Sequence, residues 1–122
     1  MTKGIGNDII EIGRIRKTIE RYGPHFHKKI FNEKELDYCL KHRDPAVPLA
    51  GRFSAKEAIA KALGTGFGKD VSFLDITIVN DKLGRPYPLF SDTFNQTFES
   101  PKILISISHC KIYATAVAIW VE

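Results

Sequence analysis

The chain has 122 residues, 43% hydrophobic and 26% charged, which is typical of one soluble globular domain spanning residues 1–122. Its net charge of +4 predicts a surface that attracts phosphates or an acidic partner, and leaves nucleic acid, coenzyme A and an acidic protein all open. No apolar run approaches the roughly 20 residues of a membrane span, and the opening residues lack the apolar stretch of a signal peptide. Cys39 and Cys110 have no metal-ligand spacing, and we interpret them as reduced thiols of a cytoplasmic protein.

The first half of the chain predicts one strand and three helices. Gly4–Ile10 has the apolar pattern of a strand, and Ile12–Tyr22 has isoleucines at helical spacing until Gly23-Pro24 ends it. We expect a second helix to begin at Asn32, because an asparagine three residues before a glutamate indicates a capping box. The third helix is predicted from about residue 45 or 48 to residue 63.

The second half predicts mainly strands. A glycine-rich loop at residues 64–68 precedes Leu74–Asn80, which alternates as a strand does, and a turn follows at residues 81–84. A short helix is expected at Ser91–Phe98, and then two strands, Ile103–His109 and Tyr113–Val121, joined by a tight turn. Because strands and helices do not alternate regularly, we predict an α+β fold with an antiparallel sheet packed against about three helices.

Two carboxylates are candidate metal ligands. Asp8 interrupts an apolar strand, where an unpaired charge is costly, so it either hydrogen-bonds the next turn or binds Mg²⁺. Glu57 lies on the third helix, where two structural roles compete with metal binding. It could form a capping box with Ser54, although Ser54 lies in the interior of the predicted helix, or it could form an ion pair with Lys61. If Asp8 and Glu57 converge, they form a site for a hard cation, and Lys61 would meet the phosphates that complete it.

Other candidates are weaker on their pattern alone. Arg14, Lys17 and Arg21 share one face of the first helix, which indicates a solvated basic face or a docking face for an acidic helix. His109 ends a strand with no second metal ligand at a suitable spacing, and a lone histidine is usually structural. The glycine-rich loop is not a phosphate-binding P-loop. Its glycines could let a ligand approach the backbone closely, but a helix C-cap followed by a flexible connection is the more common explanation.

Four blocks of the sequence are distinctive: Gly4–Glu11 with Arg14-Ile15, Leu49–Ala58 continued by Lys61–Gly66, Asp75–Ile78 with Asn80 and Gly84–Pro86, and Ser106–His109 with Ala114–Ala118. In this order they resemble the holo-acyl-carrier-protein synthases, a family of 4'-phosphopantetheinyl transferases. The match extends over nearly the whole chain, although Asn32–Pro48 and Phe90–Lys102 match less closely and supply no site residue.

The resemblance implies a function and roles for particular residues. The family moves phosphopantetheine from coenzyme A to a serine of an acyl carrier protein, releases adenosine 3',5'-bisphosphate, and supports fatty acid biosynthesis. It implies the 4'-phosphopantetheinyl transferase fold as a trimer, with active sites between neighbouring protomers. By the same resemblance, Asp8 and Glu57 are Mg²⁺ ligands, Arg52, Lys61 and His109 lie near the coenzyme A phosphates, and Arg14 meets the acidic carrier protein. Lys17 and Arg21 share the basic helix face with Arg14, so we expect them to bind the carrier protein as well.

The implied reaction is the attack of the carrier serine on the β-phosphate of coenzyme A. Mg²⁺ and Lys61 would offset the charge on the phosphates, and Glu57 or a water beside the metal would take the serine proton. A nucleic-acid-binding module would explain the basic charge but not two carboxylates at motif positions. Another coenzyme A enzyme, such as an acyltransferase, would need no magnesium.

Overall fold

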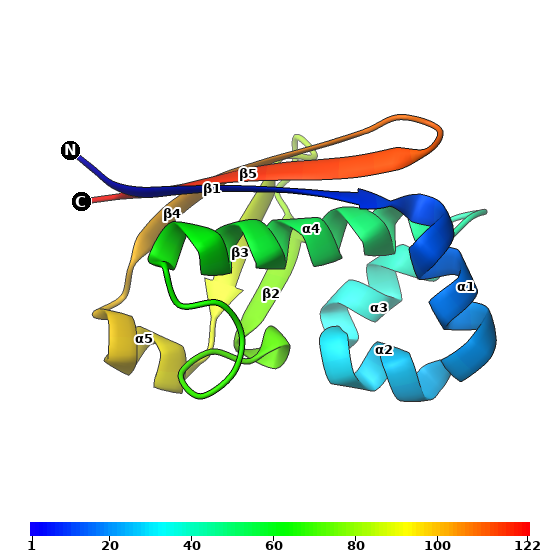
Figure 1. Ribbon diagram of the computed structural model, residues 1–122, viewed down its shortest axis with the longest axis horizontal. Coiled ribbons are helices and arrows are strands. Elements are labelled where there is room, and N and C mark those ends of the chain that lie inside the picture. Colours follow the sequence, from blue (N-terminus) through cyan, green and yellow to red (C-terminus); the bar gives the residue numbers. More distant parts are fainter.

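One long helix packed against a three-stranded antiparallel sheet forms the centre of the molecule (Figure 1). The computed structural model describes all residues from 1 to 122. The sheet has the strand order β1 (Thr2–Glu11), β5 (Tyr113–Val121), β4 (Lys102–His109), and helix α4 (Ala46–Leu63) lies along it. The expected α+β class with an antiparallel sheet is therefore confirmed.

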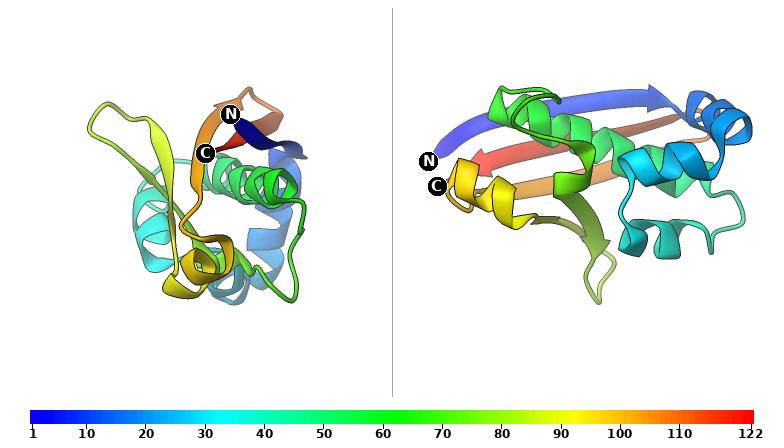
Figure 2. Two further views of the ribbon diagram at one scale, coloured as in Figure 1. Left: turned by 90° about the vertical axis from the view of Figure 1, so that its left-hand side faces the viewer. Right: turned by 90° about the horizontal axis from the view of Figure 1, so that it is seen from below.

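The remaining elements gather at the two ends of α4 (Figure 1). At one end lie three helices: α1 (Ile12–Tyr22), α2 (Pro24–Ile30) and α3 (Glu33–Cys39). Toward the other end lie the 3₁₀ helix η1 (Phe73–Asp75), the antiparallel pair β2 (Ile76–Asn80) and β3 (Pro86–Phe90), and helix α5 (Asp92–Phe98). The β2–β3 turn projects from the body of the molecule (Figure 2).

The structure has five α-helices, where the sequence predicted about three large ones and one short one. Helix α2 was missed because Gly23, at φ +54°, ends α1 and also precedes a second helix. Pro24 occupies the first turn of α2, where proline loses no hydrogen bond. Strand β2 begins at Ile76, two residues later than expected, because residues 73–75 form η1.

Helix α4 contributes residues to two apolar cores. One core combines its alanines with Ile76, Ile78, Phe94 and strands β4 and β5, and the other packs Leu49 against α1 and the α2–α3 region. Since α4 contacts neighbours on most sides, twelve of its eighteen residues are buried, and small residues let those neighbours approach. No helix of the chain is long and apolar enough to cross a membrane.

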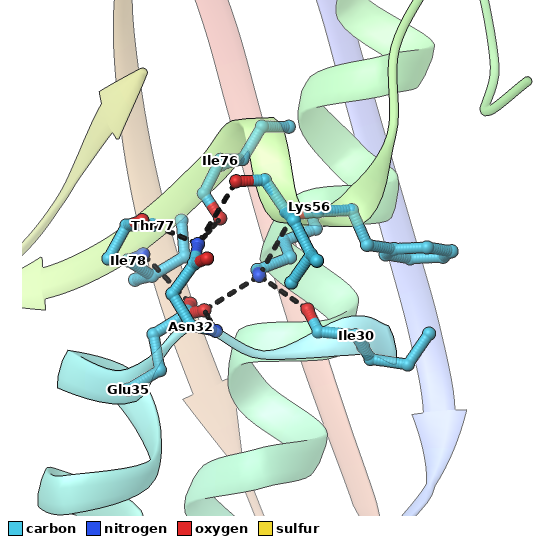
Figure 3. A network of polar contacts seen from close by, with 9 residues as sticks. Ile30, Asn32, Glu35, Lys56, Ile76, Thr77 and Ile78 are labelled. Carbon is cyan, nitrogen blue, oxygen red and sulfur yellow. Dashed lines mark hydrogen bonds and ion pairs between the residues drawn. The ribbon is translucent and has the colours of Figure 1, made fainter. Parts of the chain in front are cut away.

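A buried ion pair joins the segments around the middle of α4 (Figure 3). The side chains of Lys56 and Glu35 are fully buried, and Lys56 Nζ lies 2.7 Å from Glu35 Oε1. The ammonium group also donates to the carbonyl oxygens of Ile30 and Phe73, at 2.7 and 3.1 Å. Burial lowers the pKa of Lys56, while the Glu35 charge opposes that change.

Glu35 extends this network to the β2 strand (Figure 3). Its Oε2 accepts a hydrogen bond from the Ile78 N–H at 2.9 Å, and its Oε1 accepts one from the Asn32 N–H. The Asn32 amide in turn donates to the Thr77 hydroxyl at 2.7 Å. The capping box predicted for Asn32 is therefore confirmed, and it forms part of a network that holds α3 and β2 against α4.

We predict that Lys56→Met lowers the free energy of unfolding by about 3–5 kcal/mol, because it leaves the Glu35 carboxylate buried without a cation. Adding Glu35→Gln to Lys56→Met should recover part of this loss, since the uncompensated charge is then removed. Urea unfolding at neutral pH measures both effects. The control Lys34→Met changes an exposed lysine of α3 and should shift the unfolding free energy by less than about 0.5 kcal/mol. Equal losses for Lys56→Met and the control would contradict the prediction.

Candidate active site

Two glycines bring the β1 backbone into contact with the α4 backbone. A Cβ atom on Gly6 would lie 2.1 Å from the carbonyl oxygen of Ala58, and one on Gly4 would lie 2.1 Å from that of Ala62. Neither oxygen belongs to a side chain that can move aside, so any larger residue forces strand and helix apart. This close approach places Asp8, two residues after Gly6, beside the polar face of α4.

Asp8 is fixed from several directions. Its Oδ1 lies 3.2 Å from Lys61 Nζ, and its Oδ2 accepts a hydrogen bond from the Ser54 hydroxyl at 3.1 Å. The Asp8 carbonyl oxygen accepts a 2.7 Å hydrogen bond from the Thr115 hydroxyl of β5. Lys61 Nζ also donates to the Asn7 carbonyl oxygen at 3.0 Å. The Asp8 side chain is only 15% exposed, whereas Lys61 is half exposed, so the cluster opens to solvent on the lysine side.

Glu57 belongs to the same cluster. Partial burial raises the pKa of its carboxyl group, the nearby Asp8 charge raises it further, and Lys61 lowers it. Lys61 pairs with Asp8 rather than with Glu57, so the i,i+4 ion pair considered from the sequence is not formed. Asp8 and Lys61 are thus in direct contact, and Glu57 is near enough for its carboxyl group to respond to both charges.

The donor set suits a hard divalent cation. The chain brings two carboxylates together here and gathers no group of three or more acidic, histidine or cysteine ligands. Mg²⁺ commonly takes one or two carboxylates, with phosphate oxygens and water completing its octahedron. A cation beside Glu57 and Asp8 would also offset the repulsion that raises the pKa of Glu57.

Arg52 and His109 lie elsewhere, in a pocket of about 270 Å³ that none of Asp8, Glu57 or Lys61 lines. Arg52 and Glu57 are five positions apart on α4, which puts their side chains about 140° apart around the helix axis. The pocket is closed from the other side by residues of α3 and of the β2–β3 turn. A single chain therefore presents the predicted site residues as two separate groups.

The basic face of α1 is present as predicted. Arg14, Lys17 and Arg21 are exposed, while Ile12 and Ile15 on the opposite face are buried. The intervening Arg16 differs from these three, because it forms a 2.6 Å ion pair with Asp44.

Sequence reasoning missed several side chains that shape these two groups. Ser54 was considered only as a helix cap, and Thr115 gave no signal because it is far from Asp8 in sequence. Tyr38 and Asn80, which contact Arg52, also gave no signal of that contact. Gly64 ends α4 at φ +78°, which confirms the C-cap interpretation of the glycine-rich loop.

The chain is similar to proteins of one family along nearly its whole length. Residues 4–118 match the model of the 4'-phosphopantetheinyl transferase superfamily. A holo-acyl-carrier-protein synthase of Protochlamydia amoebophila is 57% identical over 120 residues, covering 98% of both chains. The crystal structure of the same enzyme from Neisseria meningitidis superimposes with a TM-score of 0.93 at 33% identity, over 100% of both chains. The Helicobacter pylori enzyme in complex with coenzyme A gives 0.87 at 35% identity, over 96% of this chain and 99% of that one.

We predict that Gly6→Ala lowers the free energy of unfolding by about 1–3 kcal/mol, because the added methyl group overlaps the α4 backbone. Gly13→Ala is the matched control: its Cβ would meet no atom within 4 Å, and alanine favours the helix by about 0.5–1 kcal/mol. Urea unfolding of the two variants measures the difference. A Gly6→Ala protein as stable as the Gly13→Ala protein would be incompatible with direct contact between β1 and α4.

Proposed function

Because this chain belongs to the 4'-phosphopantetheinyl transferase superfamily, we propose that it moves 4'-phosphopantetheine from coenzyme A to a serine of apo acyl carrier protein. Adenosine 3',5'-bisphosphate is the second product. The observation that carries the proposal is the cluster of Asp8, Glu57 and Lys61, two carboxylates and an ammonium group held together by packing of β1 on α4. Similarity to a coenzyme A complex supports the choice of donor.

The reaction forms a bond between the serine oxygen and the β-phosphorus of coenzyme A. The bond from that phosphorus to the bridging oxygen of the 5'-phosphate breaks, and the electron pair leaves with adenosine 3',5'-bisphosphate. Lys61, half exposed beside Asp8, is placed to stabilise charge on the phosphates. Either Glu57, whose pKa is raised by burial and by the Asp8 charge, or a water beside the metal would accept the serine proton.

Mg²⁺ is part of this proposal. Asp8 and Glu57 would hold it, since these two carboxylates are near enough to interact and carboxylate oxygens fit the ligand preference of this ion. When bound, Mg²⁺ supplies positive charge that offsets the charge of the diphosphate. Lys61, which contacts Asp8 and the Asn7 carbonyl oxygen and is half exposed, would contribute a second positive charge toward a phosphate beside this metal.

We propose further that the complete site lies between two protomers of a homotrimer. Two half-sites on separate faces of α4 support this, because Arg52 and His109 of one chain can complete the Asp8 cluster of a neighbour. The sheet face away from α4 also lacks a covering layer (Figure 1). It exposes Ile5, Ile9 and Leu104 by 67, 65 and 55%, an apolar surface that assembly would bury.

The acyl carrier protein would dock on the exposed basic face of α1, formed by Arg14, Lys17 and Arg21. An acidic helix matches this charge, and such complementarity mainly accelerates association. We place the reaction in the cytoplasm, in fatty acid biosynthesis; the free thiols of Cys39 and Cys110 agree with that location.

We predict that Asp8→Ala and Glu57→Ala each abolish transfer, because each removes a carboxylate of the proposed metal site. Mass spectrometry of apo carrier protein incubated with coenzyme A, Mg²⁺ and each variant measures the product. Asp92→Ala, which changes an exposed carboxylate on α5, is the control and should retain activity. Near wild-type transfer by either site variant at saturating Mg²⁺ would show that the cluster is not the catalytic centre.

We also predict that two defective chains complement each other. Asp8→Ala and His109→Ala subunits, unfolded and refolded together, should recover up to about a quarter of wild-type activity at low coenzyme A, because a mixed ring contains sites built from two intact halves. Each variant refolded alone provides the baseline. Activity of the mixture equal to the average of the two baselines would place the whole site within one chain.

A further inference from the structure

Arg52 is a buried cation without an acidic partner. Only 5% of the residue is exposed, yet it forms no salt bridge with any carboxylate of the chain. Its nearest charged neighbours include Lys56, whose pKa is lowered first by burial and in part by the Arg52 charge. Burying an unpaired charge is costly, so the position of Arg52 requires an explanation beyond packing.

The groups that hold Arg52 are both neutral. Its Nη2 donates a hydrogen bond to Asn80 Oδ1 at the end of β2. Its guanidinium carbon lies 4.3 Å from the centre of the Tyr38 ring of α3, within the range of a cation–π contact. Both contacts fix the guanidinium in place, and neither cancels its charge.

Asn80 is itself held in one orientation. Its Nδ2 donates to the Gly84 carbonyl oxygen at 2.9 Å across the β2–β3 turn, which directs Oδ1 toward Arg52. The turn is braced by Asp81, whose Oδ1 accepts the N–H groups of Leu83 and Arg85 at 2.8 and 2.9 Å. The hairpin therefore presents an amide oxygen, and not a carboxylate, to the arginine.

Arg52 retains an unused hydrogen-bond donor. Its Nε is buried and has no partner in the chain, and the residue lines the 270 Å³ pocket together with His109. A phosphate oxygen is the kind of acceptor that satisfies a guanidinium with an uncompensated charge.

We propose that Tyr38 and Asn80 are positioning residues that hold Arg52 in place without neutralising it, so that its charge remains available to a phosphate of coenzyme A. The inference rests on the proposed function for its ligand and deepens it. The three cations of α4 differ in the charge of their partners. Lys56 and Lys61 face carboxylates, whereas Arg52 faces an amide and an aromatic ring.

Asn80→Asp is the decisive change, because it keeps the size of the side chain and gives Arg52 a carboxylate partner, which Arg52 lacks in the wild-type protein. The coenzyme A KM should rise about tenfold or more, since the guanidinium charge is then offset within the protein. Both variants lose the hydrogen bond to Gly84, and Asn80→Ala also loses the contact to Arg52 but adds no charge, so its KM should rise less. A structural role alone predicts the opposite order, because the aspartate restores a partner for Arg52.

The test combines kinetics with binding. KM and kcat are measured with coenzyme A and carrier protein varied in turn, and calorimetry measures the affinity for adenosine 3',5'-bisphosphate without turnover. For Asn80→Asp we expect weaker binding of both nucleotides, with kcat and the carrier protein KM within about twofold of wild type. Tyr38→Phe should match wild type because the ring remains, whereas Tyr38→Leu should raise the coenzyme A KM severalfold. Urea unfolding confirms that each variant is folded.

The proposal is overturned if Asn80→Asp binds adenosine 3',5'-bisphosphate as tightly as Asn80→Ala or the wild type does. It is also overturned if Tyr38→Phe and Tyr38→Leu behave alike. These outcomes differ from failure of the proposed function, in which the wild-type protein itself transfers nothing to the carrier protein.

Discussion

Direct contact between the backbones of β1 and α4 is the constraint on which the site depends. Gly4 and Gly6 remove the side chains that would separate the two elements, so Asp8 reaches Ser54 and Lys61 from the strand side. A carboxylate in an apolar strand then becomes tolerable, because hydroxyl and ammonium groups solvate it in place of water. The same proximity makes Asp8 and Glu57 repel, which adds to the effect of burial on the pKa of Glu57, and the proposed cation would offset that repulsion.

Helix α4 uses three cations for three different purposes. Lys56 is fully neutralised by Glu35 and ties α3, η1 and the end of α2 to the helix. Lys61 is shared between Asp8 and solvent, so it is half exposed where a substrate could reach it. Arg52 is restrained by uncharged groups. Whether a cation of α4 stabilises the fold or remains available to a substrate therefore depends more on the chemistry of its partner than on whether it is lysine or arginine.

The elements with a repeating pattern could be predicted from sequence, and contacts between distant segments could not. The isoleucine spacing of α1, the Asn32 capping box and the two closing strands all match the structure. Helix α2 was missed because one glycine serves as the end of one helix and the start of the next. The resemblance assigned Asp8 and Lys61 to one site, but their direct ion pair was not predicted. Tyr38 and Asn80 meet Arg52 only through tertiary packing, and they lie where spacing carries no information.

If the two groups of site residues on separate faces of α4 are halves of one shared site, as proposed, their location also determines how the protein would tolerate damage. Surfaces that complement each other head to tail join different patches of each chain and close as a ring, whereas a twofold pair joins the same patch to itself. In such a ring every chain serves the neighbour on either side. A chain defective in both halves would silence two adjoining centres, so a minority of faulty subunits would act dominantly and depress output out of proportion to their abundance.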